Sequence, residues 1–252
     1  ARHTVGLADI AAGADPATPV LTCGDWDLAD LTWHLTEVQK FWCHVLATRP
    51  DGGPETYEVP ERPADPSVLS SVLRDTGAQL VDALTGVDPE AAAWSWSDDE
   101  TVGFTLRRQS HEAMVHHVDG VLAVGAAVPE VAPALAADGV DELVRVMLTG
   151  VPAWAAFAPS GTVVALDAAD TRDRWVMGSG RLTGTSPDSG ETYDIPAGEL
   201  LDQATVAETT VSGSAVDLLL WMWGRRAPDP LTVTGDSSGV DAVRALVLDA
   251  SR

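Results

Sequence analysis

The sequence is poor in lysine and in cysteine, and each shortage excludes a class of protein. Lys40 is the only lysine among 15 basic residues, and 38 acidic residues bring the formal net charge to −23. A surface this acidic repels phosphate groups, which argues against nucleic-acid binding and against contact with anionic membranes. Cys23 and Cys43 are the only cysteines. Two are too few for a disulfide framework, so we expect free thiols in a reducing compartment.

Long apolar runs are also missing, although 45% of the residues are hydrophobic and only 21% are charged. No run reaches the roughly 20 residues of a membrane span, and no basic segment followed by an apolar one opens the chain. We therefore expect a cytoplasmic protein. The 252 residues are enough for one large domain or two medium ones.

The first half of the chain has the periodicity of helices. Between residues 28 and 47, apolar side chains recur every three or four positions, which predicts one buried stripe along a helix. The stripe consists of Leu28, Leu31, Leu35, Val38, Trp42 and Val45. Asp25 or Asp27 can cap this helix. A short helix is predicted at 1–12, and longer ones at 66–84, 105–125 and 133–148. The four longer helices predict a helical bundle.

The second half contains short segments rich in Val, Thr and Trp, which predict strands. These are residues 162–166, 174–177, 205–211 and 231–234, with a turn region at 178–190. Ser212 or Ser214 can cap a helix at 216–223 that Gly224 ends, and a last helix is predicted at 239–249. The sequence therefore predicts an α+β protein of two domains, a helical domain at 1–150 and a small α+β domain at 151–252.

Several histidines lie close to a glutamate in the predicted helix 105–125. A zinc-protease motif would need two histidines four residues apart. His111 and His116 are five apart, about 140° around a helix, so they cannot easily share one ion. Glu112 and His116 are four apart, about 40° in angle, so both can reach one ion. The spacing selects Glu112 and His116 as candidate metal ligands.

An open catalytic metal site uses three protein ligands, so another helix must supply the third. His34 is the best candidate, because it lies well inside the apolar part of the helix at 28–47. Each residue also has a simpler explanation. His34 can be an ordinary core histidine, and Glu112 can pair with Arg108, four residues before it. Asp119 can orient His116 by accepting its second N–H, or it can face water.

Three segments resemble the mycothiol-dependent maleylpyruvate isomerases. Residues 22–35 resemble that family's Cys-Pro-Gly-Trp-x-x-x-x-Leu-x-x-His segment, with Gly24 in place of the proline. Residues 107–119 are similar to its Glu-x-x-x-His-x-x-Asp helix. Residues 211–225, followed by 233–236, resemble its C-terminal domain. The segments occur in the family's order and span nearly the whole chain, which makes them more specific together than singly.

The resemblance implies a DinB-like four-helix bundle followed by a small α+β domain. It also implies zinc bound by His34, Glu112 and His116, with mycothiol as thiol cosubstrate. Iron, cobalt, nickel or manganese would suit the same ligands. In the isomerase, the thiolate adds to the double bond of maleylpyruvate, the resulting single bond rotates, and loss of the thiol gives fumarylpyruvate. In a thiol S-transferase, the thiolate would stay attached to an electrophile instead.

A dicarboxylate substrate favours an arginine partner, and the resemblance suggests that the C-terminal domain contributes one. Arg225 is the candidate catalytic residue. Arg225 and Arg226 could equally complement the dipole at the end of the preceding helix.

Two other functions of the protein stay open at this point. The protein could be a non-catalytic module that binds a metal or a small molecule, or a structural bundle without metal.

Overall fold

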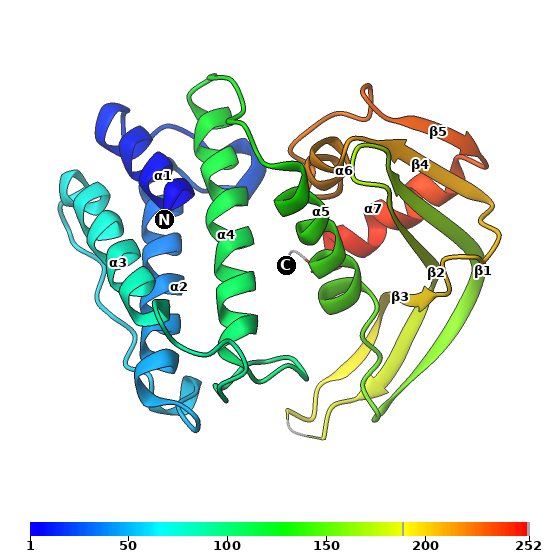
Figure 1. Ribbon diagram of the computed structural model, residues 1–252, viewed down its shortest axis with the longest axis horizontal. Coiled ribbons are helices and arrows are strands. Elements are labelled where there is room, and N and C mark those ends of the chain that lie inside the picture. Colours follow the sequence, from blue (N-terminus) through cyan, green and yellow to red (C-terminus); the bar gives the residue numbers. More distant parts are fainter. Residues whose placement is uncertain (188, 251–252) are drawn as a thin grey trace. The chain divides into compact units, whose positions relative to one another are not determined.

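The computed structural model describes residues 1–187 and 189–250. It divides the chain into two compact units, residues 1–130 and residues 131–252. The N-terminal unit is built from helices, and the C-terminal unit combines helices with a five-stranded sheet (Figure 1). This confirms the predicted two-part α+β fold. Within the described residues, no helix is both long enough and apolar enough to cross a membrane.

Four α-helices form the N-terminal unit. They are α1 (Arg2–Gly13), α2 (Leu28–Thr48), α3 (Leu69–Leu84) and α4 (Val102–Ala123). Helices α1 and α2 each contact both α3 and α4. Short 3-10 turns lie at η1 (Leu21–Cys23), η2 (Pro54–Thr56) and η3 (Pro66–Val68). The fourth helix of this bundle is therefore the short α1, and the helix predicted at 133–148 belongs to the other unit.

Side-chain caps set the start of the two helices that carry the candidate ligands. The Asp27 carboxylate accepts the Asp30 N–H at 2.8 Å, and the Asp30 carboxylate accepts the Asp27 N–H at 3.1 Å. This reciprocal capping box begins α2, so Asp27 is the cap and Asp25 is not. The Thr101 hydroxyl accepts the Phe104 N–H at 3.1 Å and begins α4, three residues before the predicted start.

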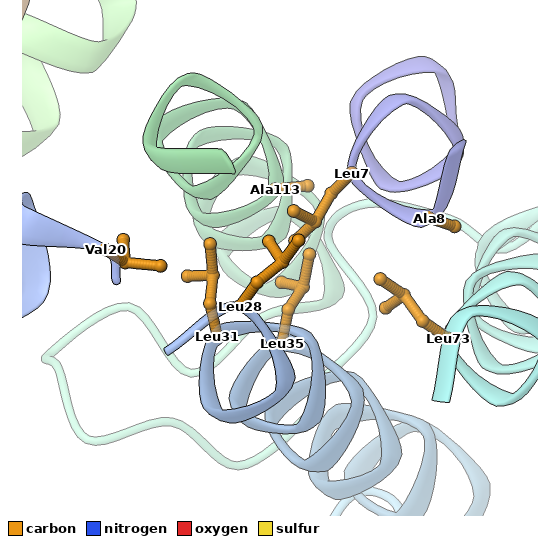
Figure 2. Packing of buried hydrophobic residues seen from close by; sticks show 8 residues of the cluster. All are labelled: Leu7, Ala8, Val20, Leu28, Leu31, Leu35, Leu73 and Ala113. Carbon is orange, nitrogen blue, oxygen red and sulfur yellow. The ribbon is translucent and has the colours of Figure 1, made fainter. Parts of the chain in front are cut away.

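A cluster of aliphatic side chains joins the four helices of the N-terminal unit (Figure 2). Its buried members are Leu7, Ala8, Val20, Leu28, Leu31, Leu35, Leu73 and Ala113. Leu28, Leu31 and Leu35 are fully buried, as the predicted stripe requires. His34 precedes Leu35 and lies about 100° from it around α2, so its side chain is only partly buried at the edge of this core.

The sheet of the C-terminal unit has the strand order β3-β2-β1-β4-β5. The strands are β1 (Ala155–Ala168), β2 (Asp173–Thr185), β3 (Thr192–Leu201), β4 (Thr209–Gly213) and β5 (Thr232–Gly235). Among the described strands, β1 and β4 pair in parallel and the other pairs are antiparallel. The helices are α5 (Pro133–Glu142), which continues into the π-helical segment η4 (Leu143–Leu148), α6 (Ala215–Met222) and α7 (Ser238–Ala250). Helix α5 contacts α6, while α7 packs on β1, β3 and β4.

The structure differs from several predictions in this half. The strand predicted at 205–211 begins only at Thr209. The turn region predicted at 178–190 is wrong for residues 178–185, which belong to β2 and pair with β3, a strand that was not predicted. A Cβ at Gly180 would overlap the carbonyl oxygen of Ala158, so this glycine permits close packing of two strands. The compact units divide at residue 130, whereas the sequence places the boundary near 150, because α5 packs on α6.

Candidate metal centre

Side chains from α2 and α4 converge at one point of the N-terminal unit. The Nε2 atoms of His34 and His116 lie 3.2 and 3.1 Å from the same oxygen, Oε1 of Glu112. One ligand atom of each residue lies within 4.8 Å of the other two. The two imidazole rings meet edge to face, with centroids 4.9 Å apart. The structure therefore brings together the three residues that the sequence selects.

The local sequence explains this convergence. Glu112 and His116 are one turn apart on α4 and project from the same face. On α2, the capping box and the buried stripe set the rotation of the helix, which directs His34 toward α4. Trp26 lies immediately before the α2 cap, and its ring stacks at a tilt on His34 with centroids 4.7 Å apart. The ring of His34 is thus held between Trp26 and His116.

The donor set fits a divalent metal ion. Two imidazole nitrogens and one carboxylate oxygen are the protein ligands of many open zinc sites, and borderline transition metals bind the same set. The side chains keep part of their surface accessible, 32% for His34, 19% for Glu112 and 12% for His116. The site therefore lies at the border of the buried region rather than deep inside it. The three residues are suited to hold an ion, and three protein ligands are the number typical of a site with an open position.

Arg108 binds the second oxygen of the Glu112 carboxylate, Oε2. Its guanidinium is almost buried and donates to Oε2 of Glu112 at 2.7 Å. The i,i+4 ion pair considered as an alternative to metal binding is therefore present, and it uses a different oxygen from the one that faces the histidines. This arrangement leaves Oε1 directed at His34 and His116, so the ion pair and the candidate ligand role are compatible.

The charges in this cluster shift one another's protonation. Burial by itself would raise the pKa of Glu112, but His116, the hydrogen bond from His34 and the charge of Arg108 hold that pKa well below its usual value. Burial would lower the pKa of His116, but Glu112 and a hydrogen bond to Asp119 raise it well above its usual value. The geometry therefore favours an ionised carboxylate facing the two imidazoles.

The fully buried carboxylate of Asp119 hydrogen-bonds to the ring nitrogen of His116 that faces away from Glu112. Asp119 accepts from Nδ1 of His116 at 2.9 Å, from the Thr22 hydroxyl at 2.6 Å and from the Cys23 thiol at 3.5 Å. An ionised carboxylate can only accept, so Nδ1 donates its proton to Asp119. Nε2 is the ring nitrogen that faces Glu112, and it would have to be free of its own proton to bind an ion. Of the two alternatives for Asp119, the structure shows the contact with His116. Sequence reasoning missed Thr22 and Cys23, because they lie almost 100 residues before Asp119.

The other histidines lie outside this triad. His111 is buried, as is His117, whose Nδ1 lies 3.1 Å from Nδ1 of His3. His44 hydrogen-bonds to the hydroxyl of Thr56 at 2.9 Å. Among the described residues, the groups of three or more potential metal ligands are the triad and a second cluster of Cys23, His116 and Asp119. Both contain His116, and neither contains His111.

Arg225 and Arg226 follow α6 in the C-terminal unit. The Arg225 guanidinium donates to the carbonyl of Trp223 at 2.6 Å and lies over the ring of the same residue, 5.7 Å from its centroid. Arg226 forms an ion pair with Asp217 in the first turn of α6. Ser214, which caps α6 by accepting the Asp217 N–H, also contacts this carboxylate. Arg226 therefore has a structural partner, and the substrate role of Arg225 stays a prediction.

Comparisons with known proteins agree on one family. Residues 1–119 match the model of the mycothiol maleylpyruvate isomerase N-terminal domain, and residues 134–242 match that of the MDMPI C-terminal domain. A crystal structure of a mycothiol-dependent maleylpyruvate isomerase superposes with a TM-score of 0.58 at 16% identity, over 94% of this chain and 90% of that one. A histidine-to-alanine mutant of such an enzyme superposes with a TM-score of 0.56 at the same identity and coverage.

No curated protein matches the sequence. At 16% identity the crystal structures show the fold alone, but the two domain models match in order and together span most of the chain. With both characteristic domains present, the chain belongs to the mycothiol-dependent maleylpyruvate isomerase family.

Proposed function

We propose that this protein is a metal- and thiol-dependent cis–trans isomerase that acts on maleylpyruvate or a closely related unsaturated dicarboxylate. The observation that carries the proposal is the convergence of His34, Glu112 and His116, with their donor atoms within 4.8 Å of one another. These residues would hold one divalent ion, and zinc suits the donor set best. When bound, such an ion supplies positive charge that favours the thiolate form of a neighbouring thiol.

The remaining residues of the site prepare it for this role. Asp119 holds the His116 ring by Nδ1, so that Nε2 faces the place where the ion would bind. Arg108 keeps Oε2 of Glu112 occupied and leaves Oε1 toward the two imidazoles. His34 is the most exposed of the three side chains, so we expect a ligand to approach from its side. Mycothiol is the thiol we propose, because the matching domain model and the similar crystal structures name it.

Isomerisation is the reaction that the comparisons favour over S-transfer. The N-terminal domain model and both similar crystal structures are described as isomerases. Isomerisation returns the thiol unchanged, whereas S-transfer consumes it. A non-catalytic metal-binding module is the second candidate, and it would bind the ion without turnover. Measuring both product formation and the total thiol concentration distinguishes isomerisation, S-transfer and metal binding without turnover.

The first prediction concerns activity. Purified protein supplied with zinc, mycothiol and maleylpyruvate should form fumarylpyruvate, while the total thiol concentration stays constant. Omitting mycothiol, or removing the metal with a chelator, should lower the rate to the uncatalysed background, and adding zinc back should restore it. Because the ion provides several kcal/mol of charge stabilisation, the difference should reach about a thousandfold or more. Steady consumption of thiol would contradict isomerisation, and metal binding without turnover would support the non-catalytic module.

The second prediction concerns Arg225, which we propose binds a carboxylate of the substrate. Arg225→Met should raise KM for maleylpyruvate by about tenfold or more, since one charge-assisted hydrogen bond contributes on the order of 1.5–3 kcal/mol. Metal content should not change. Arg181→Met is the control, because Arg181 is an exposed arginine of the same unit that pairs with Asp194. Equal KM values in the two variants would refute a substrate role for Arg225.

A further inference from the structure

We propose that Thr22 and Cys23 are positioning residues for the metal centre, acting through Asp119 on His116. The proposal rests on the proposed function, because it concerns the same site. Thr22 and Cys23 belong to the turn η1 before α2, whereas Asp119 and His116 lie near the end of α4. The contact between them therefore ties one ligand helix to a loop almost 100 residues away in sequence.

The two side chains hold both oxygens of the Asp119 carboxylate. Thr22 donates to Oδ1 at 2.6 Å, and Cys23 donates to Oδ2 at 3.5 Å. The same Oδ2 accepts the Nδ1 proton of His116 at 2.9 Å. A buried carboxylate is stable only when it is well hydrogen-bonded, and Asp119 is fully buried. Donors from different residues bind the two oxygens, so the carboxylate cannot rotate without losing a hydrogen bond. This keeps Oδ2 aligned with the imidazole.

Backbone contacts make the turn a stable platform for these donors. The Cys23 N–H donates to the Val20 carbonyl, and the Val20 N–H donates to the Trp26 carbonyl, both at 2.8 Å. Val20 is fully buried in the aliphatic cluster. Gly24 has a φ of +68°, a conformation that a side chain would strain. The shape of the turn that presents Thr22 and Cys23 is thus fixed by its own hydrogen bonds, by one buried side chain and by one glycine.

The same segment also reaches the ligand on the other helix, because Trp26 stacks on His34. Residues 20–27 therefore contact both histidines, His34 through Trp26 and His116 through Cys23, and they hold His116 through Asp119 as well. One loop thus contacts residues on both sides of the site, so a change in this loop should affect metal affinity without altering any ligand.

A second metal ion is the alternative explanation for this cluster. Cys23, His116 and Asp119 each offer a ligand atom, and these atoms lie within 4.8 Å of one another. An ion there would have to displace the Nδ1 proton of His116, and the imidazole would then bridge two ions. The observed hydrogen bond from Nδ1 to Asp119 favours the positioning role, and the number of ions per chain distinguishes the two.

The test compares Thr22→Val with Thr22→Ser in the full-length protein. Zinc affinity, measured by competition with a chromophoric chelator, should fall about tenfold in Thr22→Val, as is usual when a partner of a metal ligand is lost. Thr22→Ser keeps the hydroxyl and should restore most of the affinity. Thr76→Val is the control, because the Thr76 hydroxyl is buried in the same unit but bonds only to the Val72 carbonyl of its own helix. Unchanged affinity in Thr22→Val, or two zinc ions per chain in the unsubstituted protein, would overturn the proposal.

A second measurement does not depend on metal. In the zinc-free protein, the Nδ1 proton of His116 should give a slowly exchanging NMR signal, which Thr22→Val should broaden and Thr76→Val should leave unchanged. Equal exchange in all three proteins would overturn the positioning role. If the unsubstituted protein bound no zinc, the proposed function would fail, and the NMR comparison would still decide whether Thr22 holds His116.

Discussion

Thiol-dependent isomerase activity should fall by about a thousandfold or more in His34→Ala, because loss of a ligand removes the charge stabilisation that the ion supplies. His34 is the most exposed of the three proposed ligands, so its replacement should leave the fold intact. The rate of fumarylpyruvate formation, measured at saturating mycothiol with zinc present, is the appropriate readout. Circular dichroism of the same sample shows whether the helices are retained.

His44→Ala is the matched control for this variant. His44 is a histidine of the same helix, ten residues further along the chain, and it hydrogen-bonds to Thr56. Its replacement should leave the rate within about twofold of that of the unsubstituted protein, because it removes only contacts with Thr56 and the ring of Tyr57, outside the triad. If both variants lost activity equally, or if His34→Ala kept full activity with its helices intact, His34 would not be a metal ligand.

The free energy of unfolding of the metal-free protein should fall by on the order of 3 kcal/mol in Arg108→Met. Arg108 is 5% exposed and pairs with Glu112 at 2.7 Å. Removing the arginine leaves the largely buried Glu112 carboxylate without one of the charges that compensate it, beside that of His116. Urea denaturation followed by circular dichroism measures the change, provided that the slope of the transition stays the same.

Arg74→Met provides the comparison on the surface of the same unit. Arg74 pairs with Asp9 at 2.6 Å, but both side chains are exposed. Exposed pairs contribute about 0–1 kcal/mol, so this variant should lose at most that amount. A loss in Arg108→Met no larger than that in Arg74→Met would show that the buried pair does not support the site.

The triad could be predicted from the sequence because each of its parts has a local signal. Glu112 and His116 are one helical turn apart, and the stripe of Leu28, Leu31 and Leu35 defines the buried side of α2. The pairing of His34 with them could not be derived from periodicity, since that depends on which helices pack together. The family resemblance supplied it, and the distances in the structure agree with it.

Other features had no signal in the sequence. Thr22 and Cys23 contact Asp119 across almost 100 residues, and no spacing rule connects such positions. The glycines of β2 resemble turn residues, yet Gly180 lies in a strand where a close neighbour leaves no room for a Cβ. Helix α5 has an ordinary amphipathic pattern, which does not indicate that it packs on α6.

The metal content of the purified protein tests the central claim most directly. After incubation with zinc and removal of loosely bound ions, elemental analysis should find about one ion per chain in the unsubstituted protein. The variants His34→Ala, Glu112→Ala and His116→Ala should each lose most of it. Full metal content in all three variants, or none in the unsubstituted protein, would contradict a metal centre formed by His34, Glu112 and His116.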